Sequence, residues 1–257
     1  MAEPILSTRG LSKSFGTLKA VDDVGIDIRK GSITGLIGPN GAGKSTLFNL
    51  LTGSIQTDAG AVTLDGTDIS RLSPDRRFAR GLGRTFQIPR PFARMTVLEN
   101  VMLAPLAQTG ETIIGPFLRR AQMAADEARI AARAMEVLDF VTLAPLADHP
   151  AGKISGGQMK LLELARVLMG DPQVILLDEP AAGVNPLLTE TLIGKIEELN
   201  RQGTTFVIIE HDMDFVMRHC DPIIALAEGR LIFEGTAEDA MANAALLDAY
   251  LGSPVDA

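Results

Sequence analysis

One short segment constrains the fold of this 257-residue chain more than any other feature. It fits the pattern G-x-x-x-x-G-K-[ST] and consists of Gly38, Pro39, Asn40, Gly41, Ala42, Gly43, Lys44, Ser45 and Thr46. A strand-like apolar segment at 32–37 precedes it, and a helix-like segment at 45–51 follows it. Glycines let successive backbone N–H groups turn inward around an anion, and the helix start adds its own free N–H groups. The segment therefore predicts a strand–loop–helix unit that binds a nucleoside triphosphate, with Lys44 on the β- and γ-phosphates and Ser45 as a Mg²⁺ ligand.

Two acids directly follow a second apolar segment. Residues 174–177 are continuously apolar, as expected for a parallel strand covered on both faces, and Asp178 and Glu179 come next. Open α/β sheets bind ligands at the carboxyl ends of their strands. Asp178 is thus expected to hold Mg²⁺ opposite Ser45, and Glu179 to accept a proton from the attacking water. An acidic pair that caps a helix is the alternative interpretation.

A further glycine-rich helix start lies before these acids. It consists of Ser155, Gly156, Gly157 and Gln158, and an amphipathic segment at 158–169 follows. Its free N–H groups predict another anion site, although glycine-rich helix starts are common. A second phosphate-type site on a chain with one phosphate loop raises the question of whose phosphate it binds.

The order of the predicted elements indicates an α/β fold with a helical insertion. Short strand-like segments dominate the first sixty or so residues, and a mostly helical region with a long amphipathic segment at 117–141 extends from about 89 to 149. Alternating strand and helix patterns then resume. We expect a single domain over 1–257, with a helical subdomain at approximately 89–168 inserted in the α/β core.

Composition excludes several classes of protein. The chain has 24 basic and 32 acidic residues and a formal charge of −8, which argues against broad electrostatic binding to nucleic acid. Its single cysteine, Cys220, cannot form an internal disulfide and fits a reducing cytosol. No apolar run approaches the roughly 18 residues of a membrane span, and the N-terminus does not resemble a signal peptide. We expect a cytoplasmic chain whose membrane role, if any, comes through a partner.

Taken together, the motifs resemble those of the ABC-type ATPases. The phosphate loop, the Ser155-Gly156-Gly157-Gln158 signature and Asp178-Glu179-Pro180 occur in that family's order and spacing, and the resemblance covers essentially the whole chain. It implies a P-loop NTPase core with a mixed, mainly parallel sheet, an N-terminal antiparallel β part and an inserted α-helical subdomain. In that family two domains pair head to tail, so that each signature caps the ATP held by the other domain.

Three further residues take their expected roles from the resemblance. Phe15 matches the aromatic residue that stacks on adenine, with a plain core phenylalanine as the alternative. Gln87 matches the glutamine that touches Mg²⁺ and the attacking water and links nucleotide state to the partner. His211 matches the switch histidine that contacts the γ-phosphate. One residue departs from the family pattern: Asn185 replaces an aspartate that helps communication across the dimer, which implies altered coupling rather than loss of hydrolysis.

Several segments resemble one branch of the family, the ATP-binding subunits of branched-chain amino acid importers. They are Arg84-Thr85-Phe86-Gln87, residues 95–101, residues 179–186, residues 209–213 and Ala249-Tyr250-Leu251-Gly252. The resemblance implies ATP and Mg²⁺ as cofactors and, as partners, membrane permease subunits, which contact residues 88–94, and a second ATPase subunit. A periplasmic or extracellular substrate-binding protein would act indirectly. The chain would then be peripheral, on the cytoplasmic face of the inner membrane.

Some alternatives stay open at this stage. The same motifs serve relatives that move urea, amides or small carboxylates, and lipopolysaccharide-extracting ATPases are partly similar. A soluble ABC ATPase of the iron–sulfur assembly type has similar length and architecture. The sequence does not distinguish an ATPase homodimer from a heterodimer. A small GTP-binding protein is excluded, because the chain has no Asn-Lys-x-Asp segment.

Overall fold

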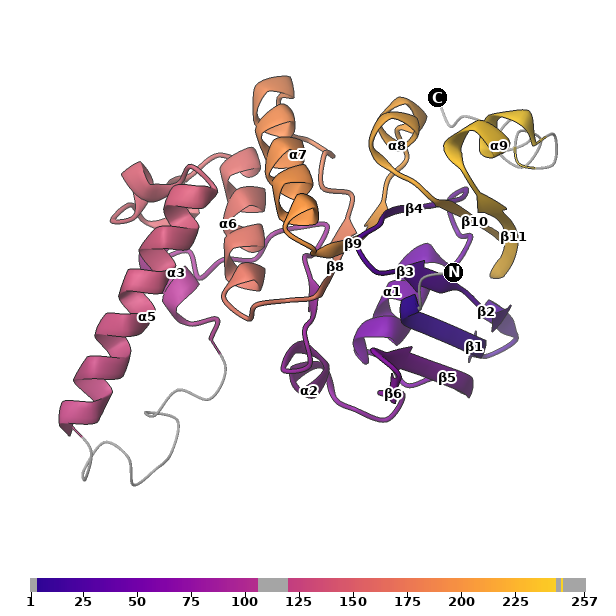
Figure 1. The fold of residues 1–257 in the computed structure, drawn as a ribbon, viewed down its shortest axis with the longest axis horizontal. Coiled ribbons are helices and arrows are strands. Elements are labelled where there is room, and N and C mark those ends of the chain that lie inside the picture. The colour runs from indigo at the N-terminus through magenta and orange to yellow at the C-terminus, as the bar shows by residue number, and fades with distance from the viewer. Residues whose placement is uncertain (1–3, 106–119, 244–245, 247–257) are drawn as a thin grey trace. The chain divides into compact units, whose positions relative to one another are not determined.

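The structure is a computed structural model that describes residues 4–105, 120–243 and 246. The chain forms two compact units (Figure 1). The first, here the sheet unit, comprises residues up to Arg84, Gln173–Ala181 and the residues from Glu197 onward. The second, here the helical unit, comprises Thr85–Pro172 and Ala182–Ile196.

The sheet unit contains an antiparallel sheet built from N-terminal strands. Its order is β2-β1-β5-β6, and β3 also pairs with β1. The strands are β1 (Pro4–Phe15), β2 (Leu18–Val24), β3 (Asp27–Arg29), β5 (Ala59–Leu64) and β6 (Thr67–Asp68). The sequence indicated only short strand-like segments in this region and did not predict the β1–β2 hairpin. The reason is that β1 continues past Gly10 through register irregularities, and these break the alternation by which a strand is recognised.

A second, mainly parallel sheet lies in the same unit. Its order is β11-β10-β4-β9-β8-β7, in which only β11 is antiparallel to its neighbour. The strands are β4 (Ile33–Ile37), β7 (Leu82–Arg84), β8 (Val174–Asp178), β9 (Thr205–Ile209), β10 (Ile223–Ala227) and β11 (Arg230–Gly235). Every residue of β8 and β9 is buried, as the continuous apolar runs predicted. The predicted α/β architecture is confirmed.

Helix α1 (Lys44–Thr52) joins the two sheets into one core. Leu47, Phe48 and Leu51 are fully buried and belong to a hydrophobic cluster with side chains from β1, β2, β5, β8, β9 and β10. The other helices of the sheet unit are α2 (Pro74–Phe78), α8 (Met213–His219) and α9 (Ala237–Ala242). Burial on both sides of α1 holds the residues at its start in a fixed position relative to the parallel sheet.

Strand register decides which residues meet at the edge of the parallel sheet. Leu36 of β4 pairs with Ile209 of β9, and Ile209 also pairs with Asp178 of β8. The carboxyl ends of these three strands are therefore level with one another. The segments that follow them, 38–43, 179–181 and 210–212, emerge along one edge.

The helical unit is built from α3 (Val97–Met102), α5 (Arg120–Phe140), α6 (Gly156–Leu168) and the first part of α7 (Pro186–Arg201). Two short 3₁₀ turns, Ala144–Leu146 and Ala151–Lys153, connect α5 to α6. Ala134 and Leu138, on the apolar face of α5, are buried, and so is Val141 directly after the helix. The first residues of the predicted 117–141 helix lie outside the described residues.

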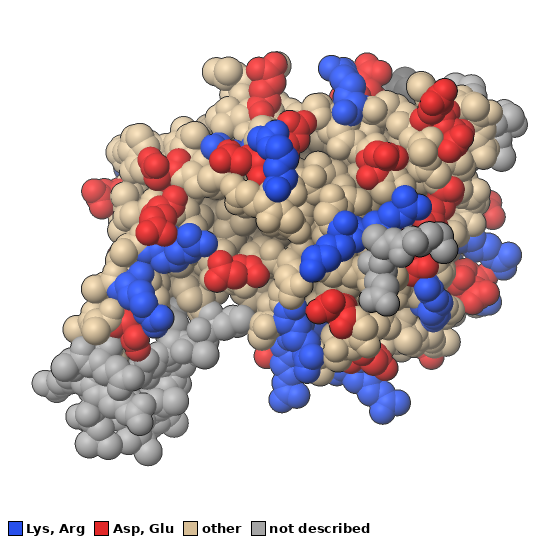
Figure 2. All heavy atoms as spheres, in the orientation of Figure 1, with Lys and Arg blue, Asp and Glu red and all other residues tan. Residues whose placement is uncertain are grey.

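The surface of the molecule carries charges of both signs. Figure 2 shows Lys and Arg side chains interspersed with Asp and Glu over the face drawn. Among the described residues, no helix is both long and apolar enough to cross a membrane.

Candidate nucleotide-binding site

The phosphate loop connects β4 to α1, as the sequence predicted. Gly43 caps the start of α1 in a left-handed conformation with φ 98°, and its carbonyl accepts the first helical bond from Leu47 N–H at 2.8 Å. Lys44 is only 6% exposed, and its Nζ donates to the carbonyls of Gly38 at 2.6 Å and Pro39 at 3.0 Å. The loop therefore wraps around its own lysine, which holds the ammonium group at the centre of the predicted phosphate site.

Burial of Lys44 affects its charge. Desolvation lowers the pKa of the ammonium group, while the nearby carboxylates of Glu179 and Asp178 act in the opposite direction. An ammonium group has three N–H donors, and the loop carbonyls accept two of them. A phosphate group would supply the negative charge that favours the protonated form.

A pocket of about 650 Å³ opens beside the loop. This volume is within the range of small-molecule sites, roughly 300–1,000 Å³. Its wall is formed by Phe15, Leu18, Lys19, Ala20, Asn40, Gly41, Ala42, Gly43, Lys44, Ser45, Thr46, Glu179, His211 and Glu228, all from the sheet unit. Gly38 and Pro39 do not line the pocket, but their backbone carbonyls accept hydrogen bonds from Lys44 Nζ. The structure thus brings most of the predicted nucleotide-binding residues to one cavity.

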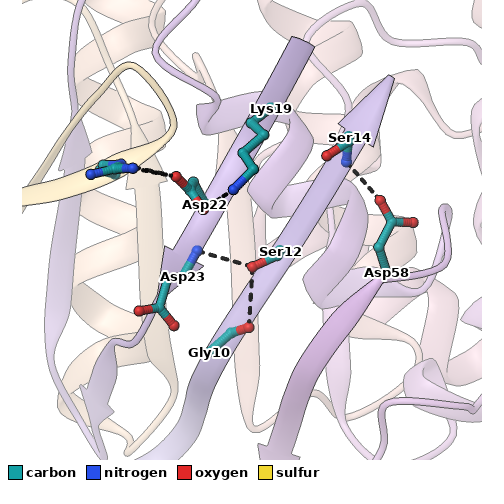
Figure 3. Close-up of polar contacts among 8 residues, drawn as sticks. Gly10, Ser12, Ser14, Lys19, Asp22, Asp23 and Asp58 are labelled. Carbon is teal, nitrogen blue, oxygen red and sulfur yellow. Dashed lines mark hydrogen bonds and ion pairs between the residues drawn. The ribbon is translucent and has the colours of Figure 1, made fainter. Parts of the chain in front are cut away.

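Phe15 projects from the β1–β2 hairpin into this pocket. Its side chain is 51% exposed, which contradicts the alternative of a plain core phenylalanine. Lys13 lies over the ring, with Nζ 5.7 Å from the ring centroid, and also donates to Asp58 Oδ1 at 2.6 Å. Asp58 Oδ2 accepts from Ser14 N–H at 2.7 Å (Figure 3). Together these bonds lower the pKa of Asp58, the Lys13 bond most, and tie the strand that carries Phe15 to β5.

The other strand of the hairpin is anchored by Asp22. Its carboxylate accepts from Lys19 Nζ at 3.1 Å and from Arg230 Nη2 at 2.6 Å (Figure 3). These bonds lower the pKa of Asp22, the bond from Arg230 having the largest effect. The Arg230 side chain is largely exposed, so the ion pair contributes little to stability, but it connects β2 to β11.

Backbone bonds also connect the hairpin to the phosphate loop through the β10–β11 turn. Gly229 N–H donates to the Ala42 carbonyl at 3.1 Å, and the Gly229 carbonyl accepts from Asp22 N–H at 2.8 Å. This turn also places Glu228 in the pocket wall. Sequence reasoning missed both contacts, because they join residues 187 and 207 positions apart and no local pattern marks them.

The two acids at the end of β8 lie in different surroundings. Asp178 is buried, and its Oδ2 accepts from Arg84 Nη2 at 2.9 Å. Glu179 adopts a left-handed conformation with φ 49°, and its N–H donates to the Ile209 carbonyl at 2.9 Å. Non-glycine residues in this region are uncommon and cluster at functional sites. The turn at Glu179 sends its side chain into the pocket.

Glu179 and His211 meet in the pocket. Glu179 Oε1 lies 3.0 Å from His211 Nε2, and both residues line the cavity. The backbone beneath them is held by Glu210, which the sequence analysis left without a role. The Glu210 carboxylate is buried and accepts from Ala181 N–H at 2.8 Å and from His211 N–H at 3.3 Å. The position of Glu210 directly after an apolar strand is the sequence signal that could have identified it as a residue of the site.

The oxygen donors near the N-terminus of α1 fit a magnesium ion. Mg²⁺ binds oxygen ligands and usually combines one or two carboxylates with waters and substrate phosphates. The Ser45 hydroxyl and the Asp178 carboxylate are oxygen donors of this kind. Within the described part of the chain, no group of three or more His, Cys, Asp and Glu side chains forms a metal cage. Two protein oxygens would leave most of the coordination sphere of the ion to waters and phosphate oxygens.

The glycine-rich start of α6 belongs to the helical unit. Ser155 caps the helix: its Oγ accepts from Gln158 N–H at 3.3 Å, and Gln158 Oε1 accepts from Ser155 N–H at 2.8 Å. A side chain on Gly157 would contact Leu188 at 2.6 Å and Val184 at 2.9 Å. A larger residue at this position would therefore require Leu188 and Val184 to move.

Two more residues with expected roles lie in the helical unit. Gln87 is exposed. Asn185, which departs from the family pattern, accepts from Leu188 N–H through Oδ1 at 3.0 Å at the start of α7. Because asparagine and aspartate both cap helices well, the substitution preserves this local bond while removing a charge.

Comparisons with known proteins place these features in context. A family model described as ABC transporter matches residues 21–182. A probable branched-chain amino acid transport ATP-binding protein LivG from Archaeoglobus fulgidus is 43% identical over 253 residues, which is 97% of this chain and 96% of the relative.

Solved structures are also similar. A nucleotide-free ATP-binding cassette from an ABC transporter aligns with a TM-score of 0.84 at 38% identity, over 97% of this chain and 99% of that one. An ATP-binding cassette of an ABC transporter in its ADP conformation aligns with a TM-score of 0.81 at 37% identity over the same shares.

Proposed function

The chain belongs to the ABC transporter family as an ATP-binding subunit, and we propose that it hydrolyses ATP to power an importer of branched-chain amino acids or a related small polar solute. One observation carries the hydrolytic part of the proposal. A single pocket combines the phosphate loop, an exposed aromatic ring and a hydrogen-bonded Glu179–His211 pair. The transported solute is inferred from the names of relatives that align over nearly their whole length.

The pocket suggests a role for each side chain. Phe15 would stack on the adenine ring, while the N–H groups at the start of α1 and the Lys44 ammonium bind the phosphates. Water would attack the γ-phosphorus as the bond to the β-phosphate oxygen breaks, and Glu179 would take the proton that the water loses. His211 bonds to Glu179, so it would hold that carboxylate toward the water and contact the γ-phosphate. The Glu210 carboxylate would support this arrangement, because it accepts from the backbone N–H groups of His211 and of Ala181, two residues after Glu179.

Magnesium has a defined place in this proposal. Ser45 and Asp178 would hold the ion, which when bound neutralises charge on the β- and γ-phosphates. Gln87 would also contact it, as the family resemblance implies.

The remaining features require other chains. We propose that two ATPase subunits pair head to tail, so that Ser155, Gly156, Gly157 and Gln158 of one close over the ATP of the other. The second subunit is a copy of this chain or a close relative. Higher affinity for ATP than for ADP in the closed dimer would drive the cycle. Permease subunits would hold the ATPase at the cytoplasmic face of the membrane, and an external binding protein would deliver the solute. Each chain would act as a single ABC ATPase domain over 1–257, with the helical subdomain at approximately 89–168.

The central experiment uses Glu179→Gln, with Glu228→Gln as the matched control. Both side chains line the pocket, but Glu179 bonds to His211 whereas Glu228 lies on the β10–β11 turn. We expect Glu179→Gln to bind ATP and to hydrolyse it about 10²–10⁴-fold more slowly. The control should hydrolyse ATP at a rate within a few-fold of wild type. Turnover like wild type in Glu179→Gln would remove Glu179 from the role of base.

The same variant tests the transport role. Tagged Glu179→Gln protein is loaded with ATP, recovered from gently solubilised membranes of its host, and analysed by mass spectrometry. Recovery of two polytopic permeases and a second ATPase supports the importer. Recovery of soluble partners alone would overturn it in favour of a cytosolic ATPase, such as one that acts in iron–sulfur assembly. Recovery of lipid- or lipopolysaccharide-export components would replace import by export.

A further inference from the structure

We infer that Arg84 is a positioning residue that sets the distance and orientation between the two proposed magnesium ligands, Ser45 and Asp178. The inference rests on the proposed function, because it concerns the metal site of the same pocket. Arg84 neither lines the pocket nor belongs to the phosphate loop. Its action would therefore pass through the residues that it holds.

The guanidinium group of Arg84 forms a fork between two elements. Nη2 donates to Asp178 Oδ2 at 2.9 Å, and Nη1 donates to Asn49 Oδ1 at 2.6 Å. The Arg84 and Asp178 side chains are only 10% and 6% exposed. The guanidinium also lies over the Phe48 ring, 5.6 Å from its centroid. A planar group held by two bonds and an aromatic face has little freedom to rotate.

Strand register places Arg84 beside Asp178. Arg84 of β7 pairs with Leu176 of β8, and Asp178 follows two residues later. Side chains two apart on a strand share a face, so Arg84 and Asp178 lie on the same face of neighbouring strands. A bond to Oδ2 orients the whole carboxylate, including the Oδ1 oxygen.

The other end of the fork reaches the helix that carries Ser45. Asn49 lies four residues after Ser45 on α1, so the two residues occupy the same face of the helix one turn apart. Arg84 thus links the Ser45 face of α1 to the Asp178 carboxylate. Lysine could not replace it, because a single ammonium on a flexible stem lacks the fixed fork that spans two acceptors.

The position of Arg84 in the chain adds a further consequence. Thr85, the next residue, begins the helical unit, and Gln87 follows two residues later. Arg84 is therefore the last residue of the sheet unit before the chain enters the helical unit.

The test compares Arg84→Lys and Asn49→Ala with the matched control Arg77→Lys. Arg77 is a buried arginine of the same unit, but it donates only to backbone carbonyls at Leu50, Leu51, Leu72 and Ser70. Binding of a fluorescent ADP analogue is measured in EDTA and across a Mg²⁺ titration. Free Mn²⁺ is followed separately by electron paramagnetic resonance, and circular dichroism confirms that each variant is folded.

We expect Arg84→Lys to bind the ADP analogue in EDTA as wild type does. The Mg²⁺ or Mn²⁺ concentration for half-maximal effect should rise about 10- to 100-fold, as for other groups that orient metal ligands. Asn49→Ala should shift it in the same direction by a smaller factor, and Arg77→Lys should leave it unchanged.

Unchanged metal dependence in a folded Arg84→Lys protein overturns the inference, and so does an equal loss of ADP binding with and without metal. If Arg84→Lys does not fold, the outcome for Asn49→Ala decides. Wild-type protein that binds no nucleotide at all overturns both this inference and the proposed function. If wild-type protein binds the ADP analogue and the Arg84 and Asn49 variants show the same metal dependence as wild type, this inference alone is overturned.

Discussion

Replacement of Gly43 by alanine tests whether the phosphate loop is pressed against the β1–β2 hairpin. Gly43 has φ 98°, and a Cβ atom there would lie 2.2 Å from the carbonyl oxygen of Ala20 on β2. Ordinary contact begins near 3.4 Å, so the loop and the strand must separate by about 1 Å. The strand has little room to retreat, because Asp22 N–H is bonded to the Gly229 carbonyl and Gly229 N–H to the Ala42 carbonyl of the loop itself.

Gly41 provides a matched control in the same loop. It also has a positive φ, 81°, but no atom lies within 4 Å of its would-be Cβ. Gly41→Ala should therefore cost only the left-handed conformation, about 1–2 kcal/mol. Gly43→Ala should cost that amount plus overpacking of about 1–3 kcal/mol. We expect the free energy of unfolding to fall by about 1–3 kcal/mol more in Gly43→Ala than in Gly41→Ala.

The functional effect should be larger than the loss of stability. A displacement of about 1 Å in groups that position a substrate can lower the reaction rate by roughly 100-fold. Urea denaturation would measure stability, and titration calorimetry with ADP would measure affinity. We expect Gly43→Ala to weaken ADP binding and to lower the rate of ATP hydrolysis by about 100-fold. Equal destabilisation of the two variants, or unchanged ADP affinity in Gly43→Ala, would refute the packing argument.

Three further predictions concern single side chains. Burial, reinforced by the charge of Glu210, raises the pKa of the Cys220 thiol to about 12, so the neutral thiol should persist at pH 8. Iodoacetamide should therefore label Cys220 only after the protein is unfolded in urea, and rapid labelling of the folded protein would contradict its burial. Arg77→Met removes four hydrogen bonds to buried or partly buried carbonyls. The free energy of unfolding, measured by urea titration, should fall by about 2–4 kcal/mol, whereas a change below about 0.5 kcal/mol would show that those bonds contribute little. Phe15→Ala should weaken ATP binding by about 1–3 kcal/mol in calorimetry while hydrolysis at saturating ATP stays near wild type, and unaltered affinity would exclude stacking by this ring.

Much of the fold could be predicted because its signals are local. The buried strands β8 and β9 are uninterrupted apolar runs, and the amphipathic face of α5 repeats at helical spacing. The β1–β2 hairpin could not be predicted in the same way, since register irregularities between Leu11 and Ser14 interrupt the alternation of a regular strand. As a result, the sequence placed Phe15 in a site without identifying the strands that hold it.

Short contiguous motifs already specify the chemistry available to the protein. The phosphate loop and Asp178-Glu179 are contiguous segments whose residue types and order specify an anion site and two acids. Such motifs are legible because neighbours along the chain stay neighbours in the fold.

How these groups meet depends on the three-dimensional arrangement of the strands. Glu179 bonds to His211 across 32 positions, and Arg84 bonds to Asp178 across 94. Both contacts depend on the order and register of β7, β8 and β9, in which each strand sets the level of the next. No local pattern encodes that register, because it results from the simultaneous packing of α1 and both sheets around one core.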